Sequence, residues 1–374
     1  MKNKISIFSI GIFLSAFILL ISCREQKAGW QGTIEEENGI TVVKNPEAPI
    51  YSEDMFSMEE ELSIGEVEGR EEYMFQQIIT IAVNDAEDIY VMDYQAKHFK
   101  VFDKYGQYIK TIGRPGQGPG EFQSPRSILC TTQKEIVVSG MNRMSYFTLE
   151  GEFIKSVPIA GVMIITADID SNGNILCFDL AMDKGVYELK KFDSDSNYLL
   201  SYGSSPLPSR PQNGGKKRSL FFPVLRWDVI NGDQIVCGYA EEGYKIKIFD
   251  GSANLIKRIE RDYTPLEVTQ REVDERMADY TPERKKNLYI PKHFPPFYAM
   301  FSDDEGRVYV WTYERTPDWE GFYYDIFDAE GKYILKVPFK TSPRFIKKNK
   351  FYTIEEDEDG FQYVKRYRMN WNLK

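Results

Sequence analysis

Alternating apolar and polar positions recur along this chain in short runs, with a repeat of about 45 residues. The clearest runs share a Phe at the second position, usually an Asp at the third, a polar four-residue turn and a second apolar stretch. They are VFDKYGQYIKTI (101–112), YFTLEGEFIKSV (146–157), KFDSDSNYLLSY (191–202), IFDGSANLIKRI (248–259) and IFDAEGKYILKV (326–337). Two alternating strands joined by a polar turn predict a β-hairpin in each of them.

Two more short apolar strands precede each hairpin. The strand next to the hairpin is DIYVMD, EIVVSG, NILCFD, QIVCGY or RVYVWT, and the one before it is QIITIAV, RSILCT, MIITADI, VLRWDVI or FYAMFSD. Each unit therefore has four antiparallel strands. A sheet of this size cannot cover both of its faces alone, which predicts that the units are blades of a β-propeller.

A sixth unit can be assembled from the two ends of the chain. Residues 350–356 and 361–369 supply two strands, and residues around 338–346 supply the inner one. The outer strand is missing there, whereas GITVVKN (39–45) has no local partner. Pairing it with residues 361–369 would close the ring and remove an open edge. The sequence thus predicts an all-β, six-bladed propeller over residues 37–374.

The first unit carries a resemblance to a known family. DAEDIYVMDYQAKHFKVFDKYGQYIKTIGRPGQGPGEFQSP (85–125) resembles the blade of NHL-repeat proteins and related six-bladed propeller lipoproteins of bacteria. The other units are more divergent but extend the resemblance over about residues 37–374. It implies a six-bladed propeller with its functional positions around the channel.

The glycine-rich stretch GRPGQGPGEF (113–122) invites comparison with phosphate-binding loops. In such loops the last glycine precedes Lys and Ser or Thr, and a helix follows. Here Gly120 precedes Glu121 and Phe122, and a strand follows. We therefore interpret the stretch as the crossing between two blades, where positive φ is needed.

Residues 264–290 interrupt the repeat between the fourth and fifth blades. Thr264 and Glu267 form a T-x-x-E capping-box pattern with Pro265 between them, and Thr281-Pro282 repeats the start signal. The pattern predicts a short helical insertion. It could act as a lid or docking element, or it could cover the edge of one blade.

The N-terminus has the features of an export signal. Lys2 and Lys4 precede an uncharged apolar run, and Leu20 to Cys23 (LISC) resemble the bacterial lipobox. The resemblance implies a lipoprotein signal peptide over 1–22, lipidation of Cys23 and a tether over 23–36; an uncleaved membrane anchor is the alternative. Arg24, where an Asp would retain enterobacterial lipoproteins at the inner membrane, implies an exported protein on the outer membrane, facing the periplasm or the surface.

Composition narrows the possible partners and cofactors. A net charge of −10 argues against nucleic acid as a partner. The cysteines after Cys23 are odd in number and lie in apolar runs, which predicts buried free thiols. DIDSNGN (168–174) matches the opening of a calcium loop, but it joins two strands and is interpreted as a turn. Neither a metal nor a cofactor is predicted.

No spacing indicates a catalytic constellation, and no catalytic residues are predicted. The inner strands instead carry residues unusual for an apolar core, and with one neighbour they form the predicted ligand-binding set: Arg126, Arg226, Trp227, Tyr298 and Trp311. The expected function is binding of a protein, peptide or glycan partner, with the lipid anchor holding the chain at the membrane. A hydrolase or lyase that uses the central channel is the alternative, and a scaffold role in an envelope complex is a third.

Overall fold

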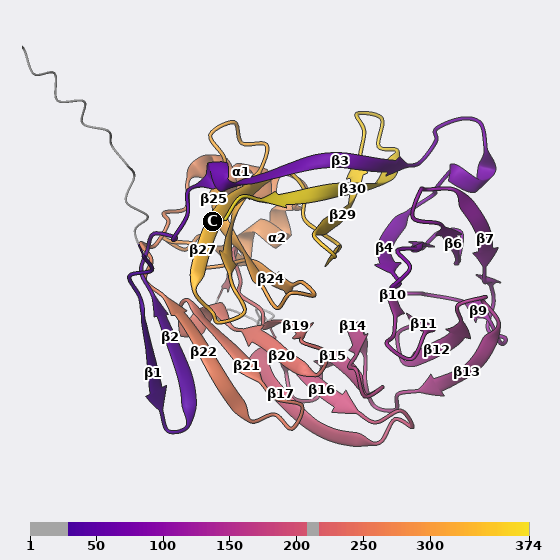
Figure 1. Cartoon of the computed structure of the whole chain (residues 1–374), viewed down its shortest axis with the longest axis horizontal. Coiled ribbons are helices and arrows are strands. Elements are labelled where there is room, and N and C mark those ends of the chain that lie inside the picture. The colour runs from indigo at the N-terminus through magenta and orange to yellow at the C-terminus, as the bar shows by residue number, and fades with distance from the viewer. Residues whose placement is uncertain (1–28, 208–216, 374) are drawn as a thin grey trace, which may run out of the picture.

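The computed structural model describes residues 29–207 and 217–373 of the 374-residue chain. The proposed signal peptide and Cys23 lie outside these residues. Five four-stranded antiparallel sheets and one six-stranded sheet surround a central channel, so the chain is a six-bladed β-propeller, as predicted (Figure 1). In the described part of the chain, no helix has the length and apolar character needed to cross a membrane.

The blades follow one another along the chain, and in each the first strand faces the channel. Blade one contains β4 (Ile78–Val83), β5 (Ile89–Asp93), β6 (His98–Phe102) and β7 (Tyr108–Ile112). Blade two contains β10 (Ser127–Cys130), β11 (Glu135–Ser139), β12 (Arg143–Thr148) and β13 (Phe153–Pro158). Blade three contains β14 (Ile164–Ile169), β15 (Ile175–Ala181), β16 (Val186–Phe192) and β17 (Tyr198–Pro206).

The second half of the ring is built in the same way, with one exception. Blade four contains β19 (Arg226–Ile230), β20 (Gln234–Gly238), β21 (Lys245–Phe249) and β22 (Leu255–Arg261). Blade five contains β24 (Ala299–Ser302), β25 (Val308–Arg315), β26 (Phe322–Phe327) and β27 (Tyr333–Phe339). Blade six contains β28 (Phe345–Lys347), β29 (Lys350–Glu356), β30 (Gln362–Trp371) and, from the N-terminal part of the chain, β3 (Phe56–Ile64).

Both residues of the repeated Phe-Asp pair have a structural role. Four of the five repeated phenylalanines are buried between blades, and Phe249 is half-buried. The aspartate that follows fixes the next turn: Asp103 accepts hydrogen bonds from the backbone N–H groups of Tyr105 (2.9 Å) and Gln107 (2.8 Å). Asp193 and Asp250 form the same turns. Such turns are a recognised use of Asp.

The prediction that residues 39–45 close the ring is wrong, although an N-terminal strand does close it. That strand is β3, which pairs antiparallel with β30. Its acidic residues face basic ones, with Glu60 3.0 Å from Lys365 and Glu61 3.2 Å from Arg366. Opposite charges across a strand pair favour this register.

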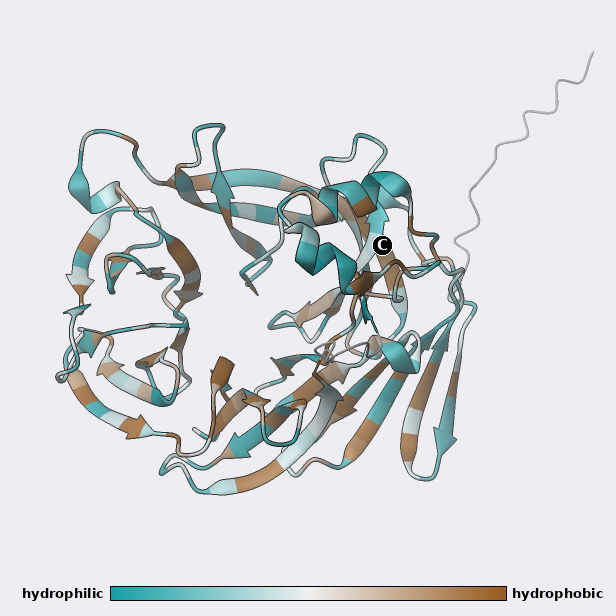
Figure 2. Cartoon of the chain, turned by 180° about the vertical axis from the view of Figure 1, so that it is seen from behind, coloured by the Kyte–Doolittle hydropathy of each residue, from teal (hydrophilic) through white to brown (hydrophobic). Residues whose placement is uncertain are grey.

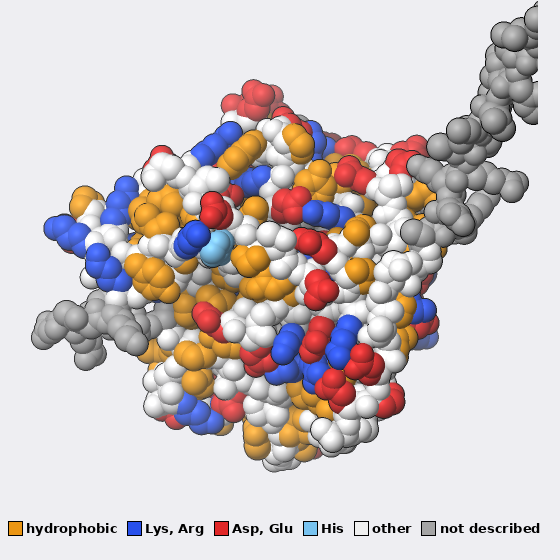
Figure 3. Space-filling view, turned by 90° about the vertical axis from the view of Figure 1, so that its left-hand side faces the viewer, with side chains coloured by type: hydrophobic (Ala, Val, Ile, Leu, Met, Phe, Trp, Pro, Cys, Tyr) orange, Lys and Arg blue, Asp and Glu red, His pale blue; other side chains and the backbone are white. Residues whose placement is uncertain are grey.

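The strand expected to close the ring lies instead on blade four. β2 (Ile40–Asn45) pairs in parallel with β22, and β1 (Thr33–Glu37) forms the outer edge beside it. Asn45 fixes the end of β2, because its side chain bonds to the backbone of Gly331 (2.9 Å) and Tyr333 (2.7 Å) in blade five. Figure 3 looks at this side of the molecule and shows basic and acidic side chains interleaved there, consistent with the ion pair of Lys44 and Glu35. Charged side chains of this kind protect an exposed strand edge from pairing with other chains.

The insertion between blades four and five is helical, as predicted. It contains α1 (Gln270–Met277) and α2 (Pro282–Lys286), which lie on the face of the ring turned toward the viewer in Figure 2. The predicted cap at Thr264 is wrong, because α1 starts at Thr269, which forms the capping box with Glu272. The backbone of residues 266–268 is extended and bonds to residues 292–294, so it cannot begin a helix. The second start, at Thr281 with Pro282 first in the helix, is confirmed.

The glycine-rich stretch is a blade crossing, as predicted. It carries β8 (Arg114–Pro115) and β9 (Glu121–Phe122), which pair with each other between blades one and two. The Glu121 carboxylate accepts hydrogen bonds from the Gly118 N–H (2.8 Å) and from Arg114 (2.8 Å). Gly113 has φ 90°, and a Cβ there would lie 2.3 Å from the Phe122 ring. Glycine is needed here for close packing.

Two smaller predictions are also confirmed. The stretch 168–174 ends β14 and then forms a turn, in which Asp170 accepts from the N–H groups of Asn172 and Asn174 at 2.9 Å. Cys177 and Cys237 are buried free thiols, and Cys130 is a half-buried one. Burial raises the pKa of each of these thiols to about 12.

Candidate functional site

Three of the five predicted ligand-binding residues line one pocket of about 450 Å³: Arg226, Tyr298 and Trp311. The pocket lies where blades four and five meet the helical insertion. We call it the arginine–aromatic pocket. Its lining consists of Arg218, Phe221, Phe222, Val224, Arg226, Glu272, Glu275, Arg276, Phe294, Tyr298, Trp311, Thr312, Tyr313, Arg315 and Phe322.

Strand pairing holds the three predicted residues in place. Arg226 is the first residue of β19, Tyr298 directly precedes β24, and Trp311 lies in β25. The backbone N–H of Tyr298 donates to the Trp311 carbonyl at 2.7 Å, which extends the β24–β25 ladder by one residue. The Nε of Arg226 donates to the Tyr298 carbonyl at 2.8 Å and so links the two blades. The two terminal nitrogens of the Arg226 guanidinium make no hydrogen bond within the described residues.

Aromatic rings form much of the pocket wall and pack mainly edge to face. The ring centres of Tyr298 and Trp311 are 4.7 Å apart, and those of Trp311 and Phe322 are 5.3 Å apart. Phe294 stacks on Tyr313 at 4.5 Å. Rings packed against one another in this way have little freedom to move, so the wall is preformed.

A separate small core holds the helical side of the pocket. Val273 of α1 is buried with Leu220, Phe221 and Phe294. In addition, β18 (Arg218–Ser219) pairs with β23 (Leu288–Tyr289). This pairing joins the segment between blades three and four to the end of the helical insertion. The insertion is thus packed onto the ring, and the arginines that it and the connection carry have defined positions.

The pocket contains four arginines and two glutamates, and both glutamates are occupied by protein groups. Glu272 forms the capping box of α1, and Glu275 pairs with Arg315 at 2.9 Å and with Arg271 at 3.2 Å. The other three pocket arginines, Arg218, Arg226 and Arg276, have no carboxylate within 4.0 Å among residues 29–207 and 217–373. With four arginines against two glutamates, the lining of the pocket carries a net positive charge.

Two further polar groups belong to residues that line the pocket: the Tyr313 hydroxyl and the Trp311 indole N–H. Burial raises the pKa of the Tyr313 hydroxyl, as does Tyr298, while the charges of Arg226 and Arg276 oppose the shift. Both guanidinium groups therefore act on the same ring. The indole N–H of Trp311 is buried and has no hydrogen-bond partner in the described part of the chain. Such an orphan donor in a native structure requires an explanation.

The other two predicted residues lie elsewhere. Arg126 is an exposed residue at the start of blade two and does not line this pocket. Trp227 follows Arg226 in β19, but it lines the central channel, a cavity of about 710 Å³ bounded by the inner strands of all six blades. Sequence reasoning missed Arg218, Arg276 and Arg315, because they come from a connection, a helix and a second strand that only folding brings together.

The central channel contains a pair of aspartates that the sequence analysis also missed. Asp168 and Asp228 occupy equivalent positions on the inner strands of blades three and four. Their partners on the next strand of each blade are Leu176 and Val236, respectively. Burial, followed by the nearby Asp228 charge, raises the pKa of Asp168 to about 7. Burial also raises the pKa of Asp228 to about 6, against hydrogen bonds from Ser302. An alignment of the inner strands would have shown that the two acids occupy the same position in neighbouring blades.

The channel's other acids have structural partners. Asp303 forms an ion pair with Arg307 at 2.6 Å, and the Asp304 carboxylate accepts from the Lys348 backbone N–H at 3.0 Å. No group of three or more His, Cys, Asp or Glu side chains in the described ranges is arranged to hold a metal ion. Among the described residues that line the channel, Asp168 and Asp228 are thus the two carboxyl groups whose pKa values lie near neutrality.

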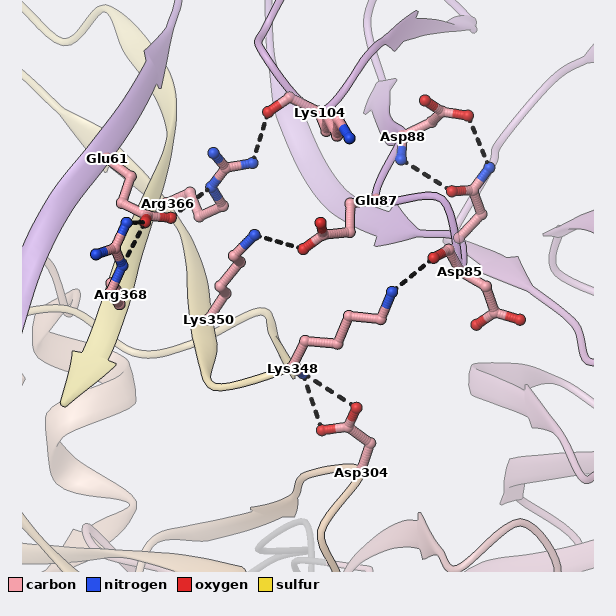
Figure 4. Close-up of polar contacts among 11 residues, drawn as sticks. Glu61, Asp85, Glu87, Asp88, Lys104, Asp304, Lys348, Lys350, Arg366 and Arg368 are labelled. Carbon is pink, nitrogen blue, oxygen red and sulfur yellow. Dashed lines mark hydrogen bonds and ion pairs between the residues drawn. The ribbon is translucent and has the colours of Figure 1, made fainter. Parts of the chain in front are cut away.

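A second polar cluster joins blade six to its neighbours (Figure 4). Lys350 contacts Glu87 at 2.5 Å, the Lys348 side chain donates to the Asp85 carbonyl at 2.7 Å, and Arg366 donates to the Lys104 carbonyl at 2.8 Å. These groups already have partners within the protein. The cluster thus stabilises the seam where the ring closes, and it has little capacity left for a ligand.

The fold and the pocket together define a class: a six-bladed β-propeller with a preformed, ligand-sized site on one face. Comparison with known proteins agrees with the fold. Residues 33–207 match the family model DUF5128, described as a six-bladed β-propeller. No curated protein matches the chain.

Two solved structures share the architecture. One is a Bacteroides fragilis protein with a proposed export assignment, similar over 88% of this chain and 99% of its own, with 10% identity and a TM-score of 0.54. The other is a member of the DUF4221 family from Bacteroides vulgatus, similar over 85% of this chain and 99% of its own, with 13% identity and a TM-score of 0.53. At such low identity the likeness establishes the fold alone.

Proposed function

We propose that this chain is an exported, lipid-anchored binding protein that holds a protein, peptide or glycan partner in the arginine–aromatic pocket. The observation that carries the proposal is the presence of three arginines without carboxylate partners beside a preformed aromatic wall. Arginine and aromatic side chains contribute most of the binding energy at many interfaces. The resemblance of Leu20 to Cys23 to a lipobox supports the anchor, and Arg24 supports the outer membrane.

Substitution of one pocket arginine tests the binding site, with a matched arginine outside it as the control. The protein is titrated by calorimetry with a panel of acidic and neutral peptides and oligosaccharides. Arg226→Ala is expected to weaken binding of the best ligand by about 1–3 kcal/mol, because Arg226 is fixed in the pocket and faces it with unpaired donors.

Arg126→Ala is the control, since Arg126 is exposed on blade two and was the other arginine expected to bind. It should leave affinity for this ligand unchanged. Unchanged affinity in the Arg226→Ala protein, with an unchanged melting temperature, would remove the pocket as the binding site.

A hydrolase or lyase that uses the central channel is the second candidate, and the pair Asp168 and Asp228 is the observation that favours it. A carboxyl group with a pKa near neutrality can act as a general acid or base. Turnover of a glycan or lactone that Asp168→Asn abolishes and Arg226→Ala preserves would establish this alternative.

A further inference from the structure

The polar groups of the arginine–aromatic pocket favour one kind of ligand. The pocket presents many hydrogen-bond donors through its arginines but few free acceptors. Both glutamates are engaged, and the Thr312 hydroxyl donates to the Tyr323 carbonyl at 2.8 Å. No Asn, Gln, Asp or Ser side chain occurs among its described lining residues. A ligand rich in hydroxyl donors, such as a neutral sugar, would leave many of them unpaired in the pocket, which is costly.

The charge of the pocket points to an anion. The chain as a whole has a net charge of −10, yet this pocket gathers three arginines without carboxylate partners. A guanidinium group offers a planar fork that matches a carboxylate through two parallel hydrogen bonds. Arg226 is already held through its Nε, so less side-chain freedom is lost when its outer nitrogens bind a ligand.

The aromatic wall adds an apolar requirement beside the anion site. The guanidinium carbon of Arg226 lies 5.1 Å from the centre of the Tyr298 ring, and Tyr298 packs against Trp311. A ligand whose carboxylate meets Arg226 therefore places its neighbouring groups against these rings. The volume of about 450 Å³ suits a short segment rather than a single small ion.

On the basis of the proposed binding function, we infer that the pocket takes a peptide segment in which a carboxylate is flanked by aromatic or branched aliphatic side chains. Peptide groups supply carbonyl acceptors for the pocket arginines, and the carboxylate supplies the negative charge that matches them. The flanking side chains bury their surface against Tyr298, Trp311 and Phe322. A peptide of this kind thus supplies acceptors for the arginine donors, a negative charge opposite the positive pocket, and apolar surface against the aromatic wall.

Calorimetry with matched probes tests the inference. The probes are acetyl-Phe-Asp-Phe-amide, its Asn isostere acetyl-Phe-Asn-Phe-amide, acetyl-Ala-Asp-Ala-amide, a trisaccharide of uronic acids and inorganic phosphate. The first peptide should bind at least about tenfold more tightly than either of the other peptides, because each lacks the charge or the rings. Arg226→Ala should reduce the preference for Asp over Asn to less than about twofold, and Arg226→Lys should retain part of it.

The other outcomes separate the inference from the function on which it rests. Equal affinity for the Asp and Asn peptides would overturn the carboxylate requirement. Tighter binding of the uronic acid trisaccharide or of phosphate, lost in the Arg226→Ala protein, would overturn the peptide inference while leaving the pocket as a binding site. If only the peptides fail and the broader panel still binds through Arg226, the inference fails and the proposed function stands. If no ligand of either set depends on Arg226, both fail.

Discussion

Asp168 and Asp228 show how two residues at equivalent positions of a repeat acquire chemistry that neither would have alone. Each lies on an inner strand where burial raises the cost of charging its carboxyl group, and the charge of Asp228 raises that cost further for Asp168. A buried carboxyl group near a like charge retains its proton to a higher pH than an exposed one. The pair therefore changes protonation between about pH 6 and pH 7, a range in which ordinary carboxylates stay charged.

Removing the charge of Asp168 should change how stability depends on pH. The folded pKa of about 7 exceeds the ordinary value of 3.8, so the folded state binds the extra proton between those values. The stabilisation from this proton is complete below about pH 4 and is lost as the pH rises to 7, by at most about 1.4 kcal/mol per pH unit. Asp168→Asn should thus be increasingly more stable than the wild type between pH 4.5 and 7.5, as measured by urea unfolding.

Asp193 offers a control of opposite sign. Hydrogen bonds from Asn197 lower the pKa of this exposed turn carboxylate. Asp193→Asn should therefore be less stable than the wild type at neutral pH and approach it as the pH falls. A pH-independent difference for Asp168→Asn would mean that Asp168 is charged throughout this range.

At the level of elements, two N-terminal strands, β2 and β3, precede the first blade, and the less apolar of them, β3, closes the ring. β2 buries Val42 and Val43, but it does so on blade four. β3 is rich in glutamate, yet it lies opposite the basic residues of β30 and completes blade six. Charge complementarity with β30 and the burial of Ile64 together match the closing strand to its partner.

Stepwise truncation distinguishes the two strands. A chain that starts at residue 49 lacks β1 and β2, and it exposes only the outer edge of blade four. A chain that starts at residue 66 also lacks β3, which opens the ring at blade six. The first truncation should lower the melting temperature by a few degrees, and the second by roughly 10 °C or more with a broader transition. Equal melting of the two truncated proteins would contradict closure by β3.

The sequence was sufficient for features that repeat locally and insufficient for those built from distant segments. Hairpins such as 101–112 could be predicted because both strands and the turn are contiguous. The partner of β3 could not be predicted, because the run of three glutamates in FSMEEELSI shows no clear alternation of apolar and polar residues and the partner strand lies at the other end of the chain. Arg226, Tyr298 and Trp311 were predicted from their unusual character, but Arg276 was not, since a surface arginine on a helix has no distinctive signal.

On the scale of the whole molecule, charge is distributed unevenly. The protein is acidic overall, which favours solubility and repels anionic surfaces, while one face of the ring carries a positive pocket beside the helical insertion. An anionic partner would therefore be attracted to one place on the molecule. The proposed anchor at Cys23 would hold the protein at a membrane surface.

The anchor is tested by substitution of the cysteine that the lipobox resemblance identifies. Cys23→Ala should abolish incorporation of labelled fatty acid and release the protein from the membrane fraction. Cys130→Ala is the matched control, because Cys130 is a half-buried free thiol within the propeller and should leave labelling unchanged. Membrane retention of both variants with the precursor size unchanged would indicate an uncleaved signal anchor instead.

The pairing of β3 with β30 has a consequence for how the chain folds. The ion pair between Glu60 and Lys365 joins residues 305 positions apart, so blade six cannot form until nearly the whole polypeptide is available. Contacts of this span raise the contact order, and chains with high contact order fold slowly. Until β30 has been synthesised, β3 has no partner in blade six and the ring stays open at this point. A chain that loses its C-terminal strand would therefore keep an unpaired β3 and an open ring, which exposes it to aggregation and proteolysis.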